Sequence, residues 1–274
     1  MISRFAVSIM SDSEDAVLLD IDDEIATVTL NRPDTRNALS ETISAGLVNA
    51  MNEIEDSTAR AVVLTGTGGS FCAGGDINAM MELMSDNAEL YEAVRRINQK
   101  TSRAIQRVYE CHLPTIAKID GIAFGAGANL ALACDIQLAS AECRLSFGFR
   151  QVGLAVDTGT SYFLPRVVGM NVAKELVYTG ELVEADRAED LGLVNHVYEE
   201  EFGEQTDAFV EDIAQGPTVA LETSKRALRQ GLEQSIDEAM TREAAHQAAV
   251  FDTHDHYEGA SAFMENRDPE FTGE

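Results

Sequence analysis

One amino acid is missing from this sequence and two are scarce. The 274 residues include no tryptophan, four lysines and four cysteines. The cysteines at positions 72, 111, 134 and 143 form no CxxC pair and have no histidine at metal-site spacing. This pattern argues against a zinc site and against a disulfide framework. We therefore expect buried free thiols, no metal ion and a cytoplasmic protein.

Long apolar runs are also missing. No run reaches about 18 residues, the length from which a transmembrane helix is predicted, so we expect no contact with a membrane. The first 15 residues, MISRFAVSIMSDSED, carry one arginine and a short apolar patch but no small-residue cleavage site. We interpret them as a flexible lead-in rather than a signal peptide.

Positive charge is the third shortage. The chain has 20 Lys and Arg residues against 47 Asp and Glu residues, which gives a formal net charge of −27. The acids are spread along the chain, and their repulsion disfavours a compact state unless salt screens it. We predict the surface of a halophilic protein, with an ordinary acidic protein as the alternative. Nucleic-acid binding is not expected, because the phosphates would be repelled.

Strand-like and helix-like patterns alternate from residue 16 to about residue 200. Short apolar runs bounded by turn residues predict strands, and Ser40 is a helix N-cap candidate before apolar residues at helical spacing. From Pro217 onward the pattern is helical. The alternation predicts an α/β fold with a helical C-terminal extension. We divide the chain into the lead-in, a core and a helical region: 1–15, 16–205 and 206–274.

Two glycine-rich turns are the sharpest local features. FCAGGDI (71–77) and FGAGANLALACDI (124–136) each follow a predicted strand and lead toward a helix. A residue at a helix start offers an unpaired N–H at the positive end of the helix dipole, and small residues let a ligand approach it. Two such turns could hold one oxygen that develops negative charge. Either turn alone is better explained as a tight strand-to-helix connection with glycine at positive φ. Neither is a phosphate loop or a dinucleotide fingerprint.

Together with NRPDTRNAL (31–39) and YTGELVEADRAEDLGLVNHV (178–197), the two turns resemble the crotonase, or enoyl-CoA hydratase/isomerase, family. The resemblance covers about residues 16–271. It implies a spiral of β-β-α units that binds acyl-CoA thioesters, and a helical C-terminal region that assembles trimers or dimers of trimers. Coenzyme A would be part of the substrate, and no separate cofactor is expected. The amides that hold the enolate oxygen would belong to Gly75 and Ala126.

The sequence departs from the hydratase pattern of this family at two positions. The pattern has one glutamate where Asn129 stands and another where Phe149 stands. Hydration needs a water held between two carboxylates, one to activate it and one to deliver a proton. Asn129 could orient a water but cannot accept its proton near neutral pH, and Phe149 can do neither. Efficient hydration is therefore not expected.

A third acidic position of the family is kept. Asp157, in GLAVDTGTSYFLPR (153–166), matches the aspartate of some isomerases, including the epoxide-type isomerase of phenylacetate breakdown. Moving a double bond needs one base, and apolar neighbours would raise the pKa of that base. The neighbours that we expect are Phe147, Phe149, Leu154, Val156 and Tyr162. The alternative is that Asp157 or Thr158 caps a helix over 159–168.

These patterns favour an acyl-CoA enoyl isomerase with Asp157 as the acid/base. One alternative is an enoyl-CoA hydratase of fatty-acid or aromatic-acid degradation that uses a water held by Asn129. Another is a non-catalytic acyl-CoA-binding subunit. A dehalogenase branch carries an aspartate at the same place but also needs a tryptophan at position 149, and this chain has none.

Further contacts with the substrate are implied by the resemblance. Arg36 and Ala38 match a segment that lies along the pantetheine and adenine of coenzyme A. Phe263 and Arg267 match a C-terminal stretch that closes over coenzyme A from a neighbouring subunit, where Asn266 replaces the usual lysine. We expect Asp76 mainly to hold its turn. The remaining positions in the expected binding set are Ala73, Asp76, Ile77, Gly125, Asn129 and Phe149.

Overall fold

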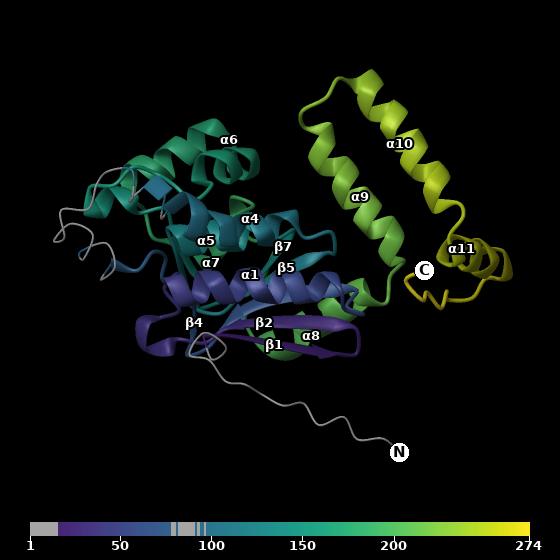
Figure 1. The fold of residues 1–274 in the computed structure, drawn as a ribbon, viewed down its shortest axis with the longest axis horizontal. Coiled ribbons are helices and arrows are strands. Elements are labelled where there is room, and N and C mark those ends of the chain that lie inside the picture. The colour runs from purple at the N-terminus through teal and green to yellow at the C-terminus, as the bar shows by residue number, and fades with distance from the viewer. Residues whose placement is uncertain (1–15, 78–80, 82–90, 92–93, 96) are drawn as a thin grey trace, which may run out of the picture.

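The larger of two β-sheets contains six strands in the order β1-β2-β3-β5-β7-β10 (Figure 1). The computed structural model describes residues 16–77, 81, 91, 94–95 and 97–274. β1 and β2 pair antiparallel, and the other neighbours in this sheet pair parallel. The strands are β1 (Val17–Asp22), β2 (Ile25–Leu30), β3 (Ala61–Gly66), β5 (Thr115–Ile119), β7 (Ile136–Ser140) and β10 (His196–Tyr198).

A smaller sheet has the order β4-β6-β8-β9. Its strands are β4 (Ser70–Cys72), β6 (Ile122–Phe124), β8 (Arg144–Ser146) and β9 (Val183–Glu184). Successive strands alternate between the sheets, since β3, β5 and β7 lie in the large sheet and β4, β6 and β8 in the small one. A helix follows the pairs β5-β6 and β7-β8. This repeat is the β-β-α spiral that the sequence predicted, and the α/β fold class is confirmed.

Helices cover both faces of the large sheet. Ser40 caps the first long helix, because its Oγ accepts the Ile43 N–H at 3.2 Å. On the opposite face, Val210 and Ala214 pack on Val63, Ile116 and Leu138. The helices that enclose the sheets are α1 (Glu41–Glu55), α4 (Arg103–Glu110), α5 (Ala126–Ala133), α6 (Thr160–Thr179), α7 (Ala185–Asp190) and α8 (Phe202–Ala214), with the short turns η1 (Pro33–Thr35), η2 (Ile97–Ser102) and η3 (Phe149–Val152).

Helix α5 lies inside the body of the molecule that contains the sheets and packs against α4 and α6 (Figure 1). All eight of its residues are buried. Seven of them are alanine, glycine or leucine, which are residue types commonly found in protein interiors. Helix α6 contains a break at Gly169, with φ 75° and ψ 162°, which divides it into two shorter helical segments. The sequence pattern also predicts a long helix over residues 86–111. The structure describes this segment only in part, as η2 and α4, because residues 86–90, 92–93 and 96 lie outside the described residues.

The last three helices extend away from the sheets (Figure 1). They are α9 (Thr218–Gly231), α10 (Ile236–Val250) and α11 (His254–Glu265). Ion pairs anchor α9 to the body: Asp135 accepts from Lys225 at 2.5 Å and from Arg229 at 2.8 Å. Across the described part of the chain, no helix has both the length and the apolar composition that crossing a bilayer requires.

Candidate active site

The two glycine turns lie directly against each other. An added Cβ on Gly74, which has φ 94°, would lie 2.5 Å from the Phe124 carbonyl oxygen. An added Cβ on Gly127, in the first turn of α5, would lie 2.2 Å from the Cys72 carbonyl oxygen. Any side chain at either position would push the turns apart. Glycine is therefore required at both positions by the close approach of two backbone segments.

This approach places Gly75 and Ala126 in the wall of one cavity. Ala126 is the first residue of α5, so its N–H lies at the positive end of the helix dipole. Within the described residues, neither the Gly75 N–H nor the Ala126 N–H donates to another backbone group. The cavity therefore has two amide donors, from two different turns, that can hold an anionic oxygen.

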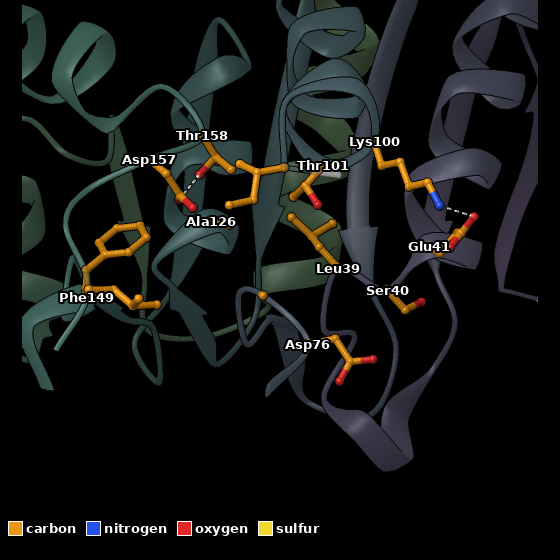
Figure 2. Close-up of a pocket in the computed structure, with 13 residues that line it drawn as sticks. Leu39, Ser40, Glu41, Asp76, Lys100, Thr101, Ala126, Phe149, Asp157 and Thr158 are labelled. Carbon is orange, nitrogen blue, oxygen red and sulfur yellow. Dashed lines mark hydrogen bonds and ion pairs between the residues drawn. The ribbon is translucent and has the colours of Figure 1, made fainter. Parts of the chain in front are cut away.

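Asp157 faces the same cavity (Figure 2). Burial raises the pKa of its carboxyl, and a hydrogen bond from the Thr158 hydroxyl lowers it in part. The distance from Thr158 Oγ1 to Asp157 Oδ1 is 3.1 Å. Of the apolar neighbours expected from the sequence, Phe149 and Leu154 line the cavity with it. The carboxyl thus lies where a base of raised pKa can meet a substrate that is held by the two amides.

The alternative, in which the side chain of Asp157 or Thr158 caps the helix over 159–168, is wrong. The N-cap of α6 is Gly159, with φ 96°, and no side chain caps this helix. Asp157 contributes its backbone carbonyl instead, which accepts from the Thr160 N–H and hydroxyl, each at 3.0 Å. Thr158 and Gly159 both have positive φ and reverse the chain direction before α6. The Asp157 carboxylate therefore does not cap the helix and lines the cavity instead.

Asn129 and Phe149, which replace the glutamates of the hydratase pattern, have different surroundings. Phe149 lines the cavity and lies beside Gly125, because a Cβ on that glycine would be 3.6 Å from the end of the ring. Asn129 is fully buried in α5, and its amide nitrogen contacts residues 157–160 rather than the cavity. Neither residue brings a carboxylate to the site.

Polar residues that were not expected to contribute to a binding site form the other end of the cavity. Lys100, from η2, pairs with Glu41 at the start of α1, and Ser40 and Thr101 lie nearby (Figure 2). Lys100 is one of only four lysines in the chain, and this scarcity was the only signal in the sequence that could have drawn attention to it.

Most of the expected binding positions lie around these turns. Asp76 lines the cavity just described. Ala73, Ile77, Gly125 and Phe149 line a second, adjoining cavity that shares Gly75 and Ala126 with the first. The two cavities therefore meet at the pair of amides.

Arg36 and Ala38 line neither cavity, but their segment braces the first glycine turn. The Arg36 carbonyl accepts the Ala73 N–H at 2.9 Å. Asn37, which the sequence analysis did not select, is fully buried and donates to the Thr67 and Ser70 carbonyls at 2.9 and 2.7 Å. The segment NRPDTRNAL thus has a structural role in fixing the turn that carries Gly75.

Phe263 and Arg267 lie away from the cavity of their own chain. Both belong to the region of α11, beyond α9 and α10 (Figure 1). Phe263 is 88% exposed, and Arg267 pairs with Glu258 and Glu265 at 2.5 and 2.8 Å. Within a single chain, these two residues do not contribute to the site.

Comparison with known proteins gives consistent matches over nearly the whole chain. The family model described as Enoyl-CoA hydratase/isomerase matches residues 20–274. A short-chain-enoyl-CoA hydratase of Clostridium acetobutylicum is 35% identical over 92% of this chain and 95% of its own length. A 1,2-epoxyphenylacetyl-CoA isomerase of Escherichia coli is 31% identical over 94% of this chain and 98% of its own. The crystal structure of an enoyl-CoA hydratase/isomerase from Cupriavidus metallidurans has a TM-score of 0.88 and 31% identity, covering 94% of this chain and 97% of that one.

Proposed function

This chain belongs to the enoyl-CoA hydratase/isomerase family, and we propose that within the family it is an isomerase that moves a double bond of an acyl-CoA thioester. The observation that carries the proposal is the composition of the cavity. Asp157 is its carboxylate with a raised pKa, and it lies in the same cavity as the Gly75 and Ala126 amides.

The proposed reaction uses one base twice. The Asp157 carboxylate removes a proton from a carbon next to the double bond, and the electrons move to the thioester oxygen. The two amides stabilise the negative charge on that oxygen because they are already oriented toward it. Asp157, now protonated, returns the proton two carbons along, which leaves the double bond shifted and the carboxylate regenerated. No water enters the reaction.

The residues at positions 129 and 149 are the reason why water is not expected to take part in the reaction. A hydratase needs a second carboxylate on the opposite side of a bound water. Phe149 presents an aromatic ring to the cavity, and the Asn129 amide is buried against residues 157–160. With no carboxylate at positions 129 and 149, proton return from Asp157 is favoured over proton transfer from water.

Replacing the base tests the proposal. Asp157→Asn keeps the shape of the side chain but removes its basicity, so turnover of Δ3-enoyl-CoA esters should fall by about 10²–10⁴. Binding of the ester, measured by calorimetry, should be retained. A variant that binds and turns over like the wild type would refute the role of Asp157. A wild type that binds esters but exchanges no C2 or C4 proton in heavy water would instead indicate a non-catalytic binding subunit.

Enoyl-CoA hydration is the second candidate function. The observation in its favour is that several relatives, including the Clostridium acetobutylicum protein, are named hydratases. In this case a water near Asn129 would have to react without the usual pair of glutamates. Parallel assays of crotonyl-CoA hydration and Δ3-to-Δ2 isomerisation distinguish the candidates, and comparable turnover in the two assays would favour hydration.

We also propose that the protein acts as a homotrimer or a dimer of trimers. Large apolar side chains on the three extended helices and their connections are exposed in the single chain, which is typical of surfaces that pack against another subunit. They include Leu228, Leu232, Ile236, Met240, Phe251, Phe263 and Met264. Light scattering should give three or six times the chain mass of 29.7 kDa.

A further inference from the structure

The buried amide of Asn129 contacts the turn that carries Asp157. Its nitrogen, Nδ2, lies 3.1 Å from the Asp157 carbonyl oxygen and 2.8 Å from the hydroxyl oxygens of both Thr158 and Thr160. Asn129 is one helical turn after Ala126 in α5. The same short helix therefore carries an amide of the oxyanion site at its start and a contact with the proposed base one turn later.

The turn that receives these contacts is strained. Thr158 has φ 47° and Gly159 has φ 96°, and the Thr160 N–H closes the turn onto the Asp157 carbonyl at 3.0 Å. A β-branched residue such as threonine strongly disfavours positive φ. Strained conformations of this kind persist only where their surroundings hold them. The Asn129 amide, which donates to this turn from inside the core, is such a constraint.

The direction of the hydrogen bonds determines which way the Thr158 hydroxyl points. A hydroxyl has one hydrogen and two lone pairs. Because Asn129 Nδ2 donates to Thr158 Oγ1, the oxygen acts as the acceptor there, and its hydrogen is directed to Asp157 Oδ1 at 3.1 Å. The Asn129 carbonyl oxygen, in contrast, is buried without a hydrogen-bond partner among the described residues. The nitrogen is therefore the functional atom of this amide.

We infer that Asn129 is a positioning residue for Asp157: its amide nitrogen holds the Thr158 hydroxyl so that this hydroxyl donates to the Asp157 carboxylate. The inference rests on the proposed function, in which Asp157 is the base. Asn129 stands where the hydratase pattern has a glutamate, and the inference assigns it a role in a site with a single base. Asn129 orients and tunes the carboxylate through Thr158, without touching the substrate.

Within the part of the chain that the structure describes, few other groups can influence this carboxyl. Burial raises the pKa of Asp157 and the Thr158 hydroxyl lowers it. Among the described residues, the other charged side chains that line the cavity are Asp76, Glu41 and Lys100, of which Glu41 and Lys100 pair with each other. A change confined to Asn129 or Thr158 leaves these charges in place.

The test uses the pH dependence of kcat/KM in four variants: Thr158→Val, Asn129→Ala, the double variant and Thr160→Val. Thr160→Val is the matched control, because its hydroxyl also contacts Asn129 at 2.8 Å but donates to the backbone carbonyl of Asp157, not to the carboxylate. Losing the Thr158 donor destabilises the ionised form of Asp157, so the pKa of Asp157 rises. The acid limb of the pH profile, where activity falls because Asp157 becomes protonated, then moves to higher pH.

We expect the acid limb to move to higher pH in Thr158→Val and Asn129→Ala and to keep its wild-type midpoint in Thr160→Val. We also expect kcat of Asn129→Ala to fall roughly ten- to a hundredfold, since a displaced base reacts poorly. The double variant should move the acid limb no further than Thr158→Val does, because residues that act through one path are not additive. An unmoved limb in Asn129→Ala, an equal shift in Thr160→Val, or additive shifts would overturn the inference.

A titration by carbon-13 NMR separates this inference from the proposed function. The Asp157 carboxyl resonance, assigned by its loss in Asp157→Asn, reports the pKa without turnover. If Asp157→Asn retains activity, the proposed function fails, yet the titration still shows whether Asn129 and Thr158 set this pKa. If Asp157→Asn is inactive and the resonance titrates identically in Asn129→Ala, only the role of Asn129 fails.

Discussion

At the scale of single residues, the site depends on how one carboxyl is surrounded. Asp157 is half-buried, lies with Phe149 and Leu154 in the cavity wall, and accepts one hydrogen bond from a neighbouring side chain. Burial disfavours the ionised form, and this is the larger influence on its pKa. The same environment that makes the carboxylate a better base makes its charge a cost to the folded protein.

This cost leads to a prediction about stability. Because the folded-state pKa of Asp157 is raised by burial above its unfolded value, its contribution to stability is fully present below the unfolded pKa and is lost as the pH rises through the folded pKa. Asp157→Asn removes the titration, so the variant should have a higher Tm than the wild type at pH 7. Calorimetry from just below the ordinary carboxyl pKa of 3.8 upward should show the difference growing with pH and then staying constant once the folded-state carboxyl is ionised. A difference that shrinks with pH would contradict it.

At the scale of elements, the contact between β4 and α5 sets the geometry of the two amides. Gly127 brings the first turn of α5 against the Cys72 carbonyl, and Gly74 brings its turn against the Phe124 carbonyl. Replacing a helical glycine by alanine usually stabilises a protein, because alanine loses less backbone entropy on folding. At Gly127 the added Cβ would instead collide with backbone, so the sign is reversed.

We predict that Gly127→Ala destabilises the protein by about 1–3 kcal/mol, the usual cost of overpacking. Isomerase kcat should fall as well, because α5 carries Ala126 and a shift of the helix moves that amide away from Gly75. Urea unfolding and steady-state kinetics measure the two effects.

Gly203 provides the matched control for Gly127→Ala. It lies in the first turn of α8, and nothing is within 4 Å of its Cβ position. Gly203→Ala should therefore stabilise the chain, by up to about 1 kcal/mol, without a change in kcat. If Gly127→Ala and Gly203→Ala changed the free energy of unfolding in the same direction, the prediction would be contradicted. Another cause than the close contact between α5 and β4 would then require glycine at position 127.

At the scale of the whole molecule, negative charge dominates. The chain carries a net charge of −27, and several of its arginines each pair with two carboxylates. Arg187 contacts Glu175 and Glu181, and Arg267 contacts Glu258 and Glu265. Exposed pairs of this kind contribute little to stability individually, so they do not offset the repulsion among the remaining acids.

We therefore predict that stability rises with salt. Raising potassium chloride from 0.1 M to 2 M shortens the screening length from about 10 Å to below about 3 Å, which weakens repulsion between neighbouring acids. Thermal unfolding should show Tm rising over this range. Potassium chloride is chosen because sulfate would also strengthen hydrophobic burial. A flat or falling Tm would favour an ordinary acidic protein over a halophilic one.

Local patterns determined much of the fold. Ser40 was predicted to cap α1 from its place before an apolar helical pattern, and the glycine turns at 71–77 and 124–136 were predicted to end strands. Strand patterns and helix caps depend on residues close together in the sequence, so they can be interpreted without the fold. The sequence also marked Asp157 as the acid at a family position.

Only the tertiary structure decided how these positions act together. The sequence left open whether Asp157 caps α6 or faces a cavity, and it did not predict that Asn129, 28 residues away, donates to Asp157's turn. For Phe263 and Arg267 the resemblance implied a contact from a neighbouring subunit, and the structure shows that neither residue lines the cavity of its own chain. The physical reason is that burial and hydrogen-bond partners arise between segments distant in sequence. No local periodicity encodes which side chains meet, and these contacts set the orientation and the pKa of the proposed base.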